Sequence, residues 1–343
     1  MNALVWEGPR LFVMRQQDTP RASSNEVVLR VAFAGICGSE LSGYLGHNAL
    51  RVPPLVMGHE FSGEITELGE TALEINPTLK LGQRVTVNPL ASCGTCDYCK
   101  KGLNHLCPKR KLIGAHRAGA FAEFVSVPAE LVHVLPESIS TRDGALAEPV
   151  AVAVRIAELA GNVQDQTVLI IGAGPIGLLA LQVLKANGAR QVFVADLDLE
   201  RLEMAGKLGG EMLNPKAVDV VATVREATNG LGAAVSVDAV GATVTRAQCV
   251  AATRSAGTVI LSGLHEENTQ MPTADIIRRE ISLKGSFAYT PANFAQALEM
   301  LIQNQIHLDN IIEAPLEEGG KWFERLISAP GNIAKVLLIP SSS

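Results

Sequence analysis

The stretch that decides the fold reads Val168-Leu169-Ile170-Ile171-Gly172-Ala173-Gly174-Pro175-Ile176-Gly177. Four apolar residues, typical of a buried strand, lead into a G-x-G-x-x-G turn, and a helix-length segment continues to about residue 187. The glycines of such a turn let the backbone approach a pyrophosphate, whose charge is favoured by the N-terminus of the following helix. Taken alone the glycine pattern is weak, but its place between a strand and a helix predicts a dinucleotide site.

An acidic residue completes this pattern. Asp196 stands nineteen residues after Gly177, at the end of the next predicted strand, 191–195. Its carboxylate can accept hydrogen bonds from both ribose hydroxyls of NAD and would repel the 2′-phosphate of NADP, so the sequence favours NAD. A glycine-rich turn with an acidic cap is the alternative, and the joint match of strand, turn, helix and acid disfavours it. By residue chemistry alone, Arg201 is a solvated side chain.

The chain has a different character on the two sides of position 150. Downstream, apolar strands at 235–238 and 258–261 alternate with helix-length segments, which indicates an α/β fold with a doubly wound parallel sheet. Upstream, the residues are β-rich with many glycines and prolines, and an Ala-rich helix over 147–160 joins the two parts. The upstream strand candidates are 27–33, 61–68 and 84–87.

Composition bounds the class of protein. A chain of 343 residues is longer than one compact core usually accommodates, so two domains are expected. Apolar residues make up 47% and charged residues 19%, as in globular proteins. A net charge of −6 disfavours nucleic acid and anionic membranes as partners, because both reward a basic face. No secretion signal or membrane-spanning stretch is recognised, and the crowding of the cysteines favours a metal and a reducing cytoplasm over disulfides.

Four cysteines follow one another within a single short segment. Their spacing, C-x2-C-x2-C-x7-C, brings four thiolates close enough to surround Zn²⁺ as a tetrahedron. Four protein ligands leave no open position, so this zinc is predicted to be structural. The alternative, free or disulfide-paired cysteines, is disfavoured at this spacing. The four residues are Cys93, Cys96, Cys99 and Cys107.

A second set of metal-binding residue types is scattered along the first 150 residues. Taken singly, Cys37 is explained as a core thiol, His59 as a hydrogen-bonded loop residue and Glu148 as a charge at a helix N-terminus. Spacing alone does not assemble them into one site. The residues themselves say only that a cysteine, a histidine and nearby carboxylates such as Glu60 are apt ligands for an open zinc site.

The whole chain resembles the medium-chain zinc-dependent alcohol dehydrogenases. The resemblance implies a GroES-like β-rich catalytic domain over 1–150, to which 286–343 return, and a Rossmann domain over 151–285 that binds NAD. It is carried, in order, by Gly35-x-Cys37-Gly38-Ser39, Gly58-His59-Glu60-Phe61-Ser62-Gly63-Glu64, the four cysteines, Gly119-x-Phe121-Ala122-Glu123-Phe124, Glu148-Pro149, the glycine turn, Leu283-Lys284-Gly285-Ser286-Phe287 and Lys335-Val336-Leu337-Leu338-Ile339.

The resemblance also implies roles for individual residues. It places Cys37, His59 and Glu148 around a catalytic zinc, with Glu60 as an alternating or supporting ligand and Ser39 as the hydroxyl that relays the alcohol proton. The implied chemistry is hydride transfer between a hydroxyl-bearing carbon and NAD, with one catalytic and one structural zinc. The residues implied to line the NAD site are Gly172, Gly174, Pro175, Ile176, Gly177, Asp196, Arg201, Ser262, Gly263, Leu264, Ser286 and Phe287.

Within the family the chain looks closest to sorbitol-type polyol, sugar-acid and galactitol-phosphate dehydrogenases. L-threonine 3-dehydrogenase and a 2,3-butanediol-type dehydrogenase are the alternatives. Threonine is less favoured because Ser42 stands where that enzyme usually has a histidine, while Glu40 replaces the usual aspartate. A non-catalytic relative that binds NAD should have lost metal ligands, and here all are present. The expected partners are a small polar alcohol and copies of the same chain, as a homodimer or homotetramer.

Overall fold

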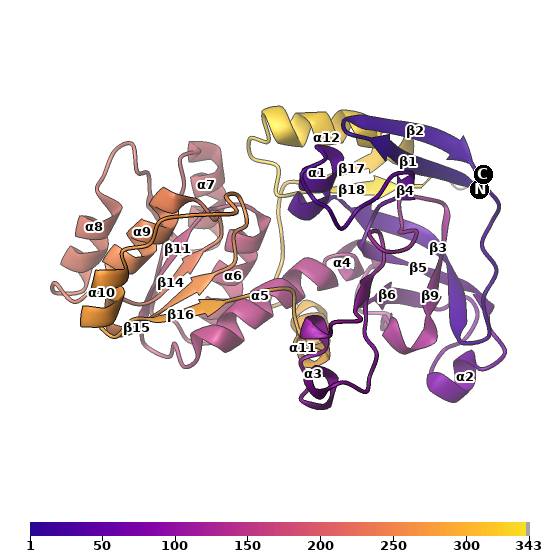
Figure 1. The fold of residues 1–343 in the computed structure, drawn as a ribbon, viewed down its shortest axis with the longest axis horizontal. Helices are drawn as coiled ribbons and strands as arrows, with labels where there is room; N and C mark the ends of the chain where they lie inside the picture. Colours follow the sequence, from indigo (N-terminus) through magenta and orange to yellow (C-terminus); the bar gives the residue numbers. More distant parts are fainter. Residues whose placement is uncertain (341–343) are drawn as a thin grey trace. The chain divides into compact units, whose positions relative to one another are not determined.

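The computed structural model describes residues 1–340 (Figure 1), which form two compact units. The first unit contains Met1–Glu148, Thr290–Gln303 and the described residues from Asn310 onward. The second unit contains Pro149–Tyr289 and Asn304–Asp309. Within residues 1–340, no helix is both long enough and apolar enough to cross a membrane.

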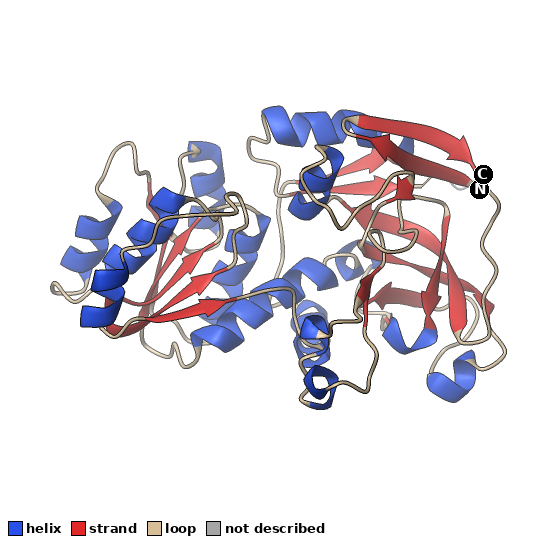
Figure 2. Ribbon diagram, in the orientation of Figure 1, coloured by secondary structure: helices blue, strands red, loops and turns tan. Residues whose placement is uncertain are grey.

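The second unit is built on one six-stranded parallel sheet. The strand order β13-β12-β11-β14-β15-β16 is that of a doubly wound sheet, with β11 and β14 side by side at the point where the order reverses. Helices flank the sheet on both sides (Figure 2), which confirms the expected α/β class. Its elements are α5 (Ala147–Ala160), β11 (Thr167–Ile171), α6 (Pro175–Ala186), β12 (Gln191–Ala195), α7 (Leu199–Lys207), β13 (Glu211–Leu213), α8 (Val220–Ala227), β14 (Ala233–Asp238), α9 (Thr243–Ala252), β15 (Thr253–Leu261), α10 (Thr273–Arg278) and β16 (Ser282–Gly285).

Burial explains why these segments form strands. All five residues of β11 and all six of β14 are buried, as expected for central strands that are covered on both faces. At the other extreme, all four residues of the edge strand β16 are exposed. Strand β15 begins five residues earlier than the predicted 258–261. Its first part contains a register shift against β14 and a left-handed residue, Ala256, so it lacks the apolar run that sequence inspection recognises.

The first unit is mainly β-structure. Its strands are β1 (Asn2–Gly8), β2 (Leu11–Gln16), β3 (Glu26–Gly35), β4 (Leu55–Val56), β5 (Glu60–Leu68), β6 (Arg84–Val87), β7 (Leu90–Ala91), β8 (Lys111–Leu112), β9 (Phe124–Pro128), β10 (Val132–Val134), β17 (Ile311–Pro315) and β18 (Lys335–Ile339). Its α-helices are α1 (Gly38–Tyr44), α2 (Ala72–Ile75), α3 (Asp97–Lys100), α4 (Thr141–Gly144), α11 (Pro291–Ile302) and α12 (Gly319–Ser328). Single 3₁₀ turns are Asn104–Leu106, Ala129–Leu131 and Leu316–Glu318.

One strand organises this unit. β3 pairs antiparallel with β5, β9 and β18, so segments distant in sequence meet along it in the order β10-β6-β5-β3-β18-β17. The register places Gly35, the last residue of β3, opposite Glu60, the first residue of β5. The chain therefore leaves β3 and enters β5 at the same edge of the sheet. Phe61, Phe121 and Phe323 are among the large side chains buried in the core behind this edge.

Candidate functional site

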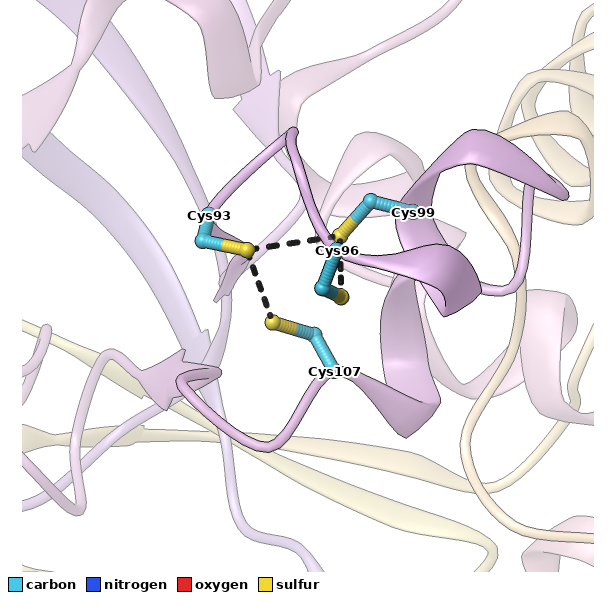
Figure 3. A group of neighbouring side chains, drawn as sticks. All are labelled: Cys93, Cys96, Cys99 and Cys107. Carbon is cyan, nitrogen blue, oxygen red and sulfur yellow. Dashed lines mark hydrogen bonds between the residues drawn. The ribbon is translucent and has the colours of Figure 1, made fainter.

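The four cysteines predicted to bind the structural zinc converge at one point (Figure 3). Sγ of Cys93 lies 4.0 Å from Sγ of Cys99 and 3.5 Å from Sγ of Cys107, and Sγ of Cys96 lies 3.5 Å from Sγ of Cys99. A Zn–S bond of about 2.3 Å gives a tetrahedron with edges of about 3.8 Å, so this spacing and these soft donors fit Zn²⁺.

Local chain geometry produces this convergence. Gly94 and Gly102 take left-handed conformations with φ of 69° and 72°, which glycine adopts at low cost, and Cys96 begins the single turn of α3. The backbone amide and the hydroxyl of Thr95 lower the pKa of Cys93 to about 5. This thiol is therefore ionised at neutral pH, in the form that binds a metal.

The second group of metal-binding residues forms where β3 ends and β5 begins. Cys37 is the N-cap of α1, two residues after β3 ends, while His59 immediately precedes β5 and Glu60 is its first residue. Their ligand atoms all lie within 4.8 Å of one another. The cause is the antiparallel register that sets Gly35 opposite Glu60, because it brings the two chain segments together at one edge. One sulfur, one imidazole and a carboxylate are a donor set suited to zinc.

Glu40 contacts both chain segments that supply Cys37, His59 and Glu60. Its carboxylate is fully buried and lies 2.7 Å from Nδ1 of His59. It also accepts hydrogen bonds from the backbone amides of Cys37 (3.1 Å) and Gly58 (2.9 Å). Because Nδ1 is engaged, Nε2 is the ring atom that remains for a metal. The glutamate side chain at position 40 is thus long enough to reach the histidine.

The charges of this pair are coupled. Burial by itself would raise the pKa of Glu40, but the facing His59 and Arg51 outweigh it and hold that pKa below its ordinary value. Burial would likewise lower the pKa of His59, and the neighbouring Glu40 and Cys37 instead keep it well above its ordinary range. Glu40 is therefore an anion that orients the imidazole, as carboxylates behind metal-binding histidines commonly do.

Glu60 is shared between the metal group and a buried cation. Nζ of Lys335 donates to both carboxylate oxygens, at 2.9 and 2.7 Å, and both side chains are almost fully buried. A Cβ on Gly35 would lie 2.3 Å from Oε2 of Glu60, so only glycine leaves room for the carboxylate here. Sequence analysis quotes Lys335 only as part of the closing motif and assigns it no role, although a lysine that begins an otherwise apolar strand is a signal of a buried charged partner.

Glu148 and Ser39 occupy two further positions near this group. Glu148 is buried in the first turn of α5 and is not part of the set that lies within 4.8 Å, but its charge acts on Lys335 and helps to raise the pKa of that lysine. Ser39 is exposed at the start of α1, and its hydroxyl donates to Sγ of Cys37 at 3.4 Å. Arg51, a second residue that sequence analysis missed, donates hydrogen bonds to the carbonyl oxygen and the hydroxyl of Ser39.

The glycine turn of the second unit lies between β11 and α6. Gly172 has a φ of 106°, and a Cβ on Gly177 would lie 1.8 Å from the carbonyl oxygen of Gly172, so neither position admits a side chain. Gly174 faces open space, where a Cβ would come no closer than 3.9 Å to Arg201. This opening at the first turn of α6 fits the approach of a dinucleotide pyrophosphate.

Asp196 lies beside this turn. One carboxylate oxygen accepts the backbone amide of Ala173 at 2.7 Å and the other accepts the amide of Asp198 at 3.0 Å. The remaining predicted cofactor residues follow β15 and β16, at the same carboxyl edge of the parallel sheet. Ser262 and Gly263 both donate through their amides to the carbonyl of Asp238. Leu264 and Phe287 are exposed, and the amide of Ser286 is bonded to Leu261.

Comparison with known proteins gives a consistent result. Residues 23–137 match the alcohol dehydrogenase GroES-like domain, and residues 175–303 match the zinc-binding dehydrogenase domain. The chain is 34% identical to D-arabitol-phosphate dehydrogenase of Enterococcus avium over 93% of its length and 91% of that protein. It is 34% identical to sorbitol dehydrogenase of Halalkalibacterium halodurans over 99% of both chains. The solved structure of 2R,3R-butanediol dehydrogenase from Bacillus subtilis superposes with a TM-score of 0.91, at 29% identity and 99% coverage of both chains.

Proposed function

The chain belongs to the medium-chain zinc-dependent alcohol dehydrogenases, as an enzyme of their polyol branch that uses zinc and a nicotinamide dinucleotide, and from this premise we propose how its residues carry the reaction. The substrate is a secondary hydroxyl of a polyol, sugar alcohol or sugar derivative, and the hydride acceptor is NAD. The observation that carries the proposal is the convergence of Cys37, His59 and Glu60 at the junction of β3 and β5.

We assign the catalytic zinc to Cys37, His59 and Glu148, with Glu60 as the alternating ligand, and the structural zinc to the four cysteines. Bound by three protein ligands, zinc supplies an open position and a Lewis acid for the substrate oxygen. Glu40 keeps the imidazole of His59 oriented toward that metal. Lys335 holds the carboxylate of Glu60 and balances its charge in the buried site.

Ser39 moves the proton. Its exposed hydroxyl beside Cys37 accepts the proton that leaves the substrate hydroxyl and passes its own hydrogen to solvent, so the serine ends the step unchanged. The same path in reverse protonates a carbonyl substrate.

L-Threonine is less favoured as the substrate. A 2,3-butanediol-type substrate is the second candidate, because the solved butanediol dehydrogenase matches the chain over 99% of its length.

NAD is proposed to bind along the carboxyl edge of the second unit's sheet, at the twelve residues named above. Asp196 is the residue that selects NAD over NADP, because its carboxylate meets the ribose hydroxyls and repels a 2′-phosphate. Asp196→Ala should weaken NADH binding about thirtyfold, the equivalent of about 2 kcal/mol for a lost charge-assisted hydrogen bond. It should also reduce the ratio between the affinities for NADH and NADPH. Fluorescence titration with both cofactors measures the two effects.

Two further proposals concern the surroundings of the enzyme. We propose a homodimer or homotetramer, which the fully exposed edge strand β16 supports, because such edges are usually paired or covered. We also propose a reducing compartment, the cytoplasm, since the described chain carries six free cysteines. Light scattering on the purified protein determines the number of chains, and a monomer would remove the first of these proposals.

The decisive experiment for the function combines metal analysis with substrate screening. The enzyme should contain two zinc ions per chain and reduce NAD, measured by NADH absorbance, with members of a panel of polyols, sugar phosphates, 2,3-butanediol and β-hydroxy amino acids. One zinc or none, with no turnover across the panel, would favour a non-catalytic protein that binds NAD.

A further inference from the structure

Arg51 is buried beside the proposed catalytic centre, yet the mechanism above does not use it. It lies in the loop between α1 and β4, and only 4% of its surface is exposed. Nη1 donates to the carbonyl oxygen of Ser39 at 3.2 Å, and Nη2 donates to Oγ of the same serine at 3.3 Å. Two donors of one planar guanidinium thus bind both the backbone carbonyl and the side-chain hydroxyl of Ser39. Arginine can make this two-point contact, whereas lysine cannot.

The chain makes room for this contact. Gly43 lies on α1 under the arginine, and a Cβ there would come within 2.6 Å of Cδ of Arg51. Gly43 is inside a helix, where glycine costs about 1 kcal/mol relative to alanine. The space above it is filled by the arginine side chain. The absence of a side chain at Gly43 therefore leaves the space that the Arg51 side chain fills.

The charge of Arg51 also has a counterpart. The guanidinium acts on the fully buried Glu40, the carboxylate that orients His59, and lowers the pKa of that group. Nε of Arg51 is buried and has no hydrogen-bond partner among the described residues. Arg51 thus connects Ser39 with the carboxylate behind the metal group, while Lys335 plays the equivalent part beside Glu60.

From this geometry we infer that Arg51 is a positioning residue that holds the Ser39 hydroxyl beside Cys37 for proton transfer. A free serine hydroxyl rotates, and its hydrogen follows whichever acceptor is near. Here Arg51 occupies one lone pair of Oγ while the hydroxyl hydrogen faces Sγ of Cys37, so one lone pair remains for the substrate's proton. As that proton binds, the serine's own hydrogen leaves Sγ of Cys37 for solvent, and the hydroxyl is restored. Arg51 keeps its own protons throughout, because a guanidinium is not deprotonated in proteins.

This inference rests on the proposed catalytic zinc site, and its test separates the two. The full-length enzyme is prepared with zinc in the four-cysteine site and cobalt in the Cys37 site, so that the sulfur-to-cobalt absorption band reports on Cys37. Arg51→Gln and Ser39→Ala should each shift this band in the same direction, and the double variant should show no further shift. If the wild-type enzyme shows no such band, the proposed metal site fails; if the band is present and Arg51→Gln leaves it unmoved, the inference about Arg51 fails.

Kinetics gives a second test, with the best panel alcohol as substrate. Arg51→Gln should lower kcat about thirtyfold, as expected for a misplaced proton-transfer group, and leave the KM for NAD unchanged. In the Ser39→Ala background the same substitution should change kcat less than about threefold, because Arg51 acts through Ser39. An equal loss in both backgrounds would show that Arg51 contacts the substrate itself or only supports the fold, and would overturn the inference.

Two variants guard against loss of folding. Gly43→Ala should displace the guanidinium through its Cβ, while the higher helix propensity of alanine offsets part of the packing cost, so that kcat falls as in Arg51→Gln in a protein that still unfolds cooperatively. Arg51→Lys keeps the charge but not the two-point grip, and should recover less than half of the lost rate. Arg21→Gln, at a side chain that is 88% exposed, is the matched control and should behave as the wild type. A full recovery by Arg51→Lys would replace the positioning role with one of charge alone.

Discussion

The two proposed zinc sites of this enzyme are built in opposite ways. The four cysteines lie within residues 93–107, on a loop that two left-handed glycines bend back on itself. The second group combines Cys37, just after β3, with His59 and Glu60, where β5 begins, and Lys335 on β18 supports it. A short loop is enough to assemble the first site, whereas the second exists only when the whole sheet of the first unit has formed.

This contrast implies a division of labour. The ligands of the first site all lie within one loop, so its metal is expected to stabilise that loop in particular. A site assembled from distant strands is held in place by the protein, through Glu40 beneath His59 and Lys335 beside Glu60, before any metal arrives. Metal loss from the two sites should therefore have different consequences, and variants at each site measure the difference.

The largest effect is expected from Cys37→Ala. Loss of this ligand removes the catalytic zinc, and turnover should fall at least about 10⁴-fold, the equivalent of about 5–6 kcal/mol in the barrier. Zinc content should drop from two ions per chain to one, while the melting temperature and NADH binding stay close to those of the wild type. Kinetics, metal analysis and calorimetry check the three expectations. Turnover retained in a zinc-stripped variant would contradict the assignment of this site.

A substitution in the four-cysteine site should mainly reduce stability. Cys99→Ser should destabilise the segment around residues 92–112 by about 5 kcal/mol, since loss of a structural metal is among the few large single-residue effects. The exposed Lys100 and Lys101 should then become rapid trypsin cleavage sites, whereas the Cys37 site keeps its zinc. Limited proteolysis with metal analysis measures this. Loss of both metals together would show that the two sites are not independent.

The support of the distributed site is tested next by Lys335→Met. The substitution leaves the carboxylate of Glu60 buried without its cation, which should cost about 3–5 kcal/mol in the free energy of unfolding. Glu60→Gln in the same chain should recover most of this loss. Lys80→Met, at an exposed position of the same unit, serves as the control for loss of a lysine. Denaturant unfolding monitors all variants, and a loss no larger than that of the control would mean that the ion pair contributes little.

The smallest effect is expected from a tether formed by Arg117 and Glu26, the first residue of β3. Burial would raise the pKa of Glu26, but Arg117, whose Nη1 lies 2.5 Å away, and Ser126 outweigh it and keep that pKa below its ordinary value of 4.5. The contact therefore stabilises the folded state above about pH 4.5, and this contribution is lost as the pH falls through the lowered pKa. Arg117 is one-third exposed, so the effect should stay below about 1 kcal/mol.

Melting curves of the wild type and Glu26→Gln between pH 7 and pH 4 measure this tether. The two melting temperatures should differ at neutral pH and converge at the acidic end of the range. A gap that widens in acid would contradict the sign of the pKa shift. The guanidinium of Arg117 donates both to Glu26 and to the carbonyl oxygen of Ser126.

Sequence analysis succeeded where a physical constraint is local. The parallel α/β sheet followed from apolar strands that alternate with helices, and the glycine turn followed from a strand that runs directly into a helix. Strands β1, β2, β9, β10 and β17 were not predicted. No residue of β2 and only one of β17 is buried, and β10 has three residues, so their patterns resemble those of loops.

What the sequence determined by itself was therefore the nucleotide fold and the cluster of four thiols, and it also carries the prediction that NAD is preferred over NADP. Each depends on residues that are neighbours along the chain, whose relative positions the backbone limits to a few ångströms. Tertiary structure alone decided the rest. The antiparallel pairing of β3 and β5 brings Cys37 to His59, and β18 delivers Lys335 across 275 positions to Glu60. Hydrophobic periodicity does not show which distant segments come into contact, because strand register is set by packing of the entire sheet.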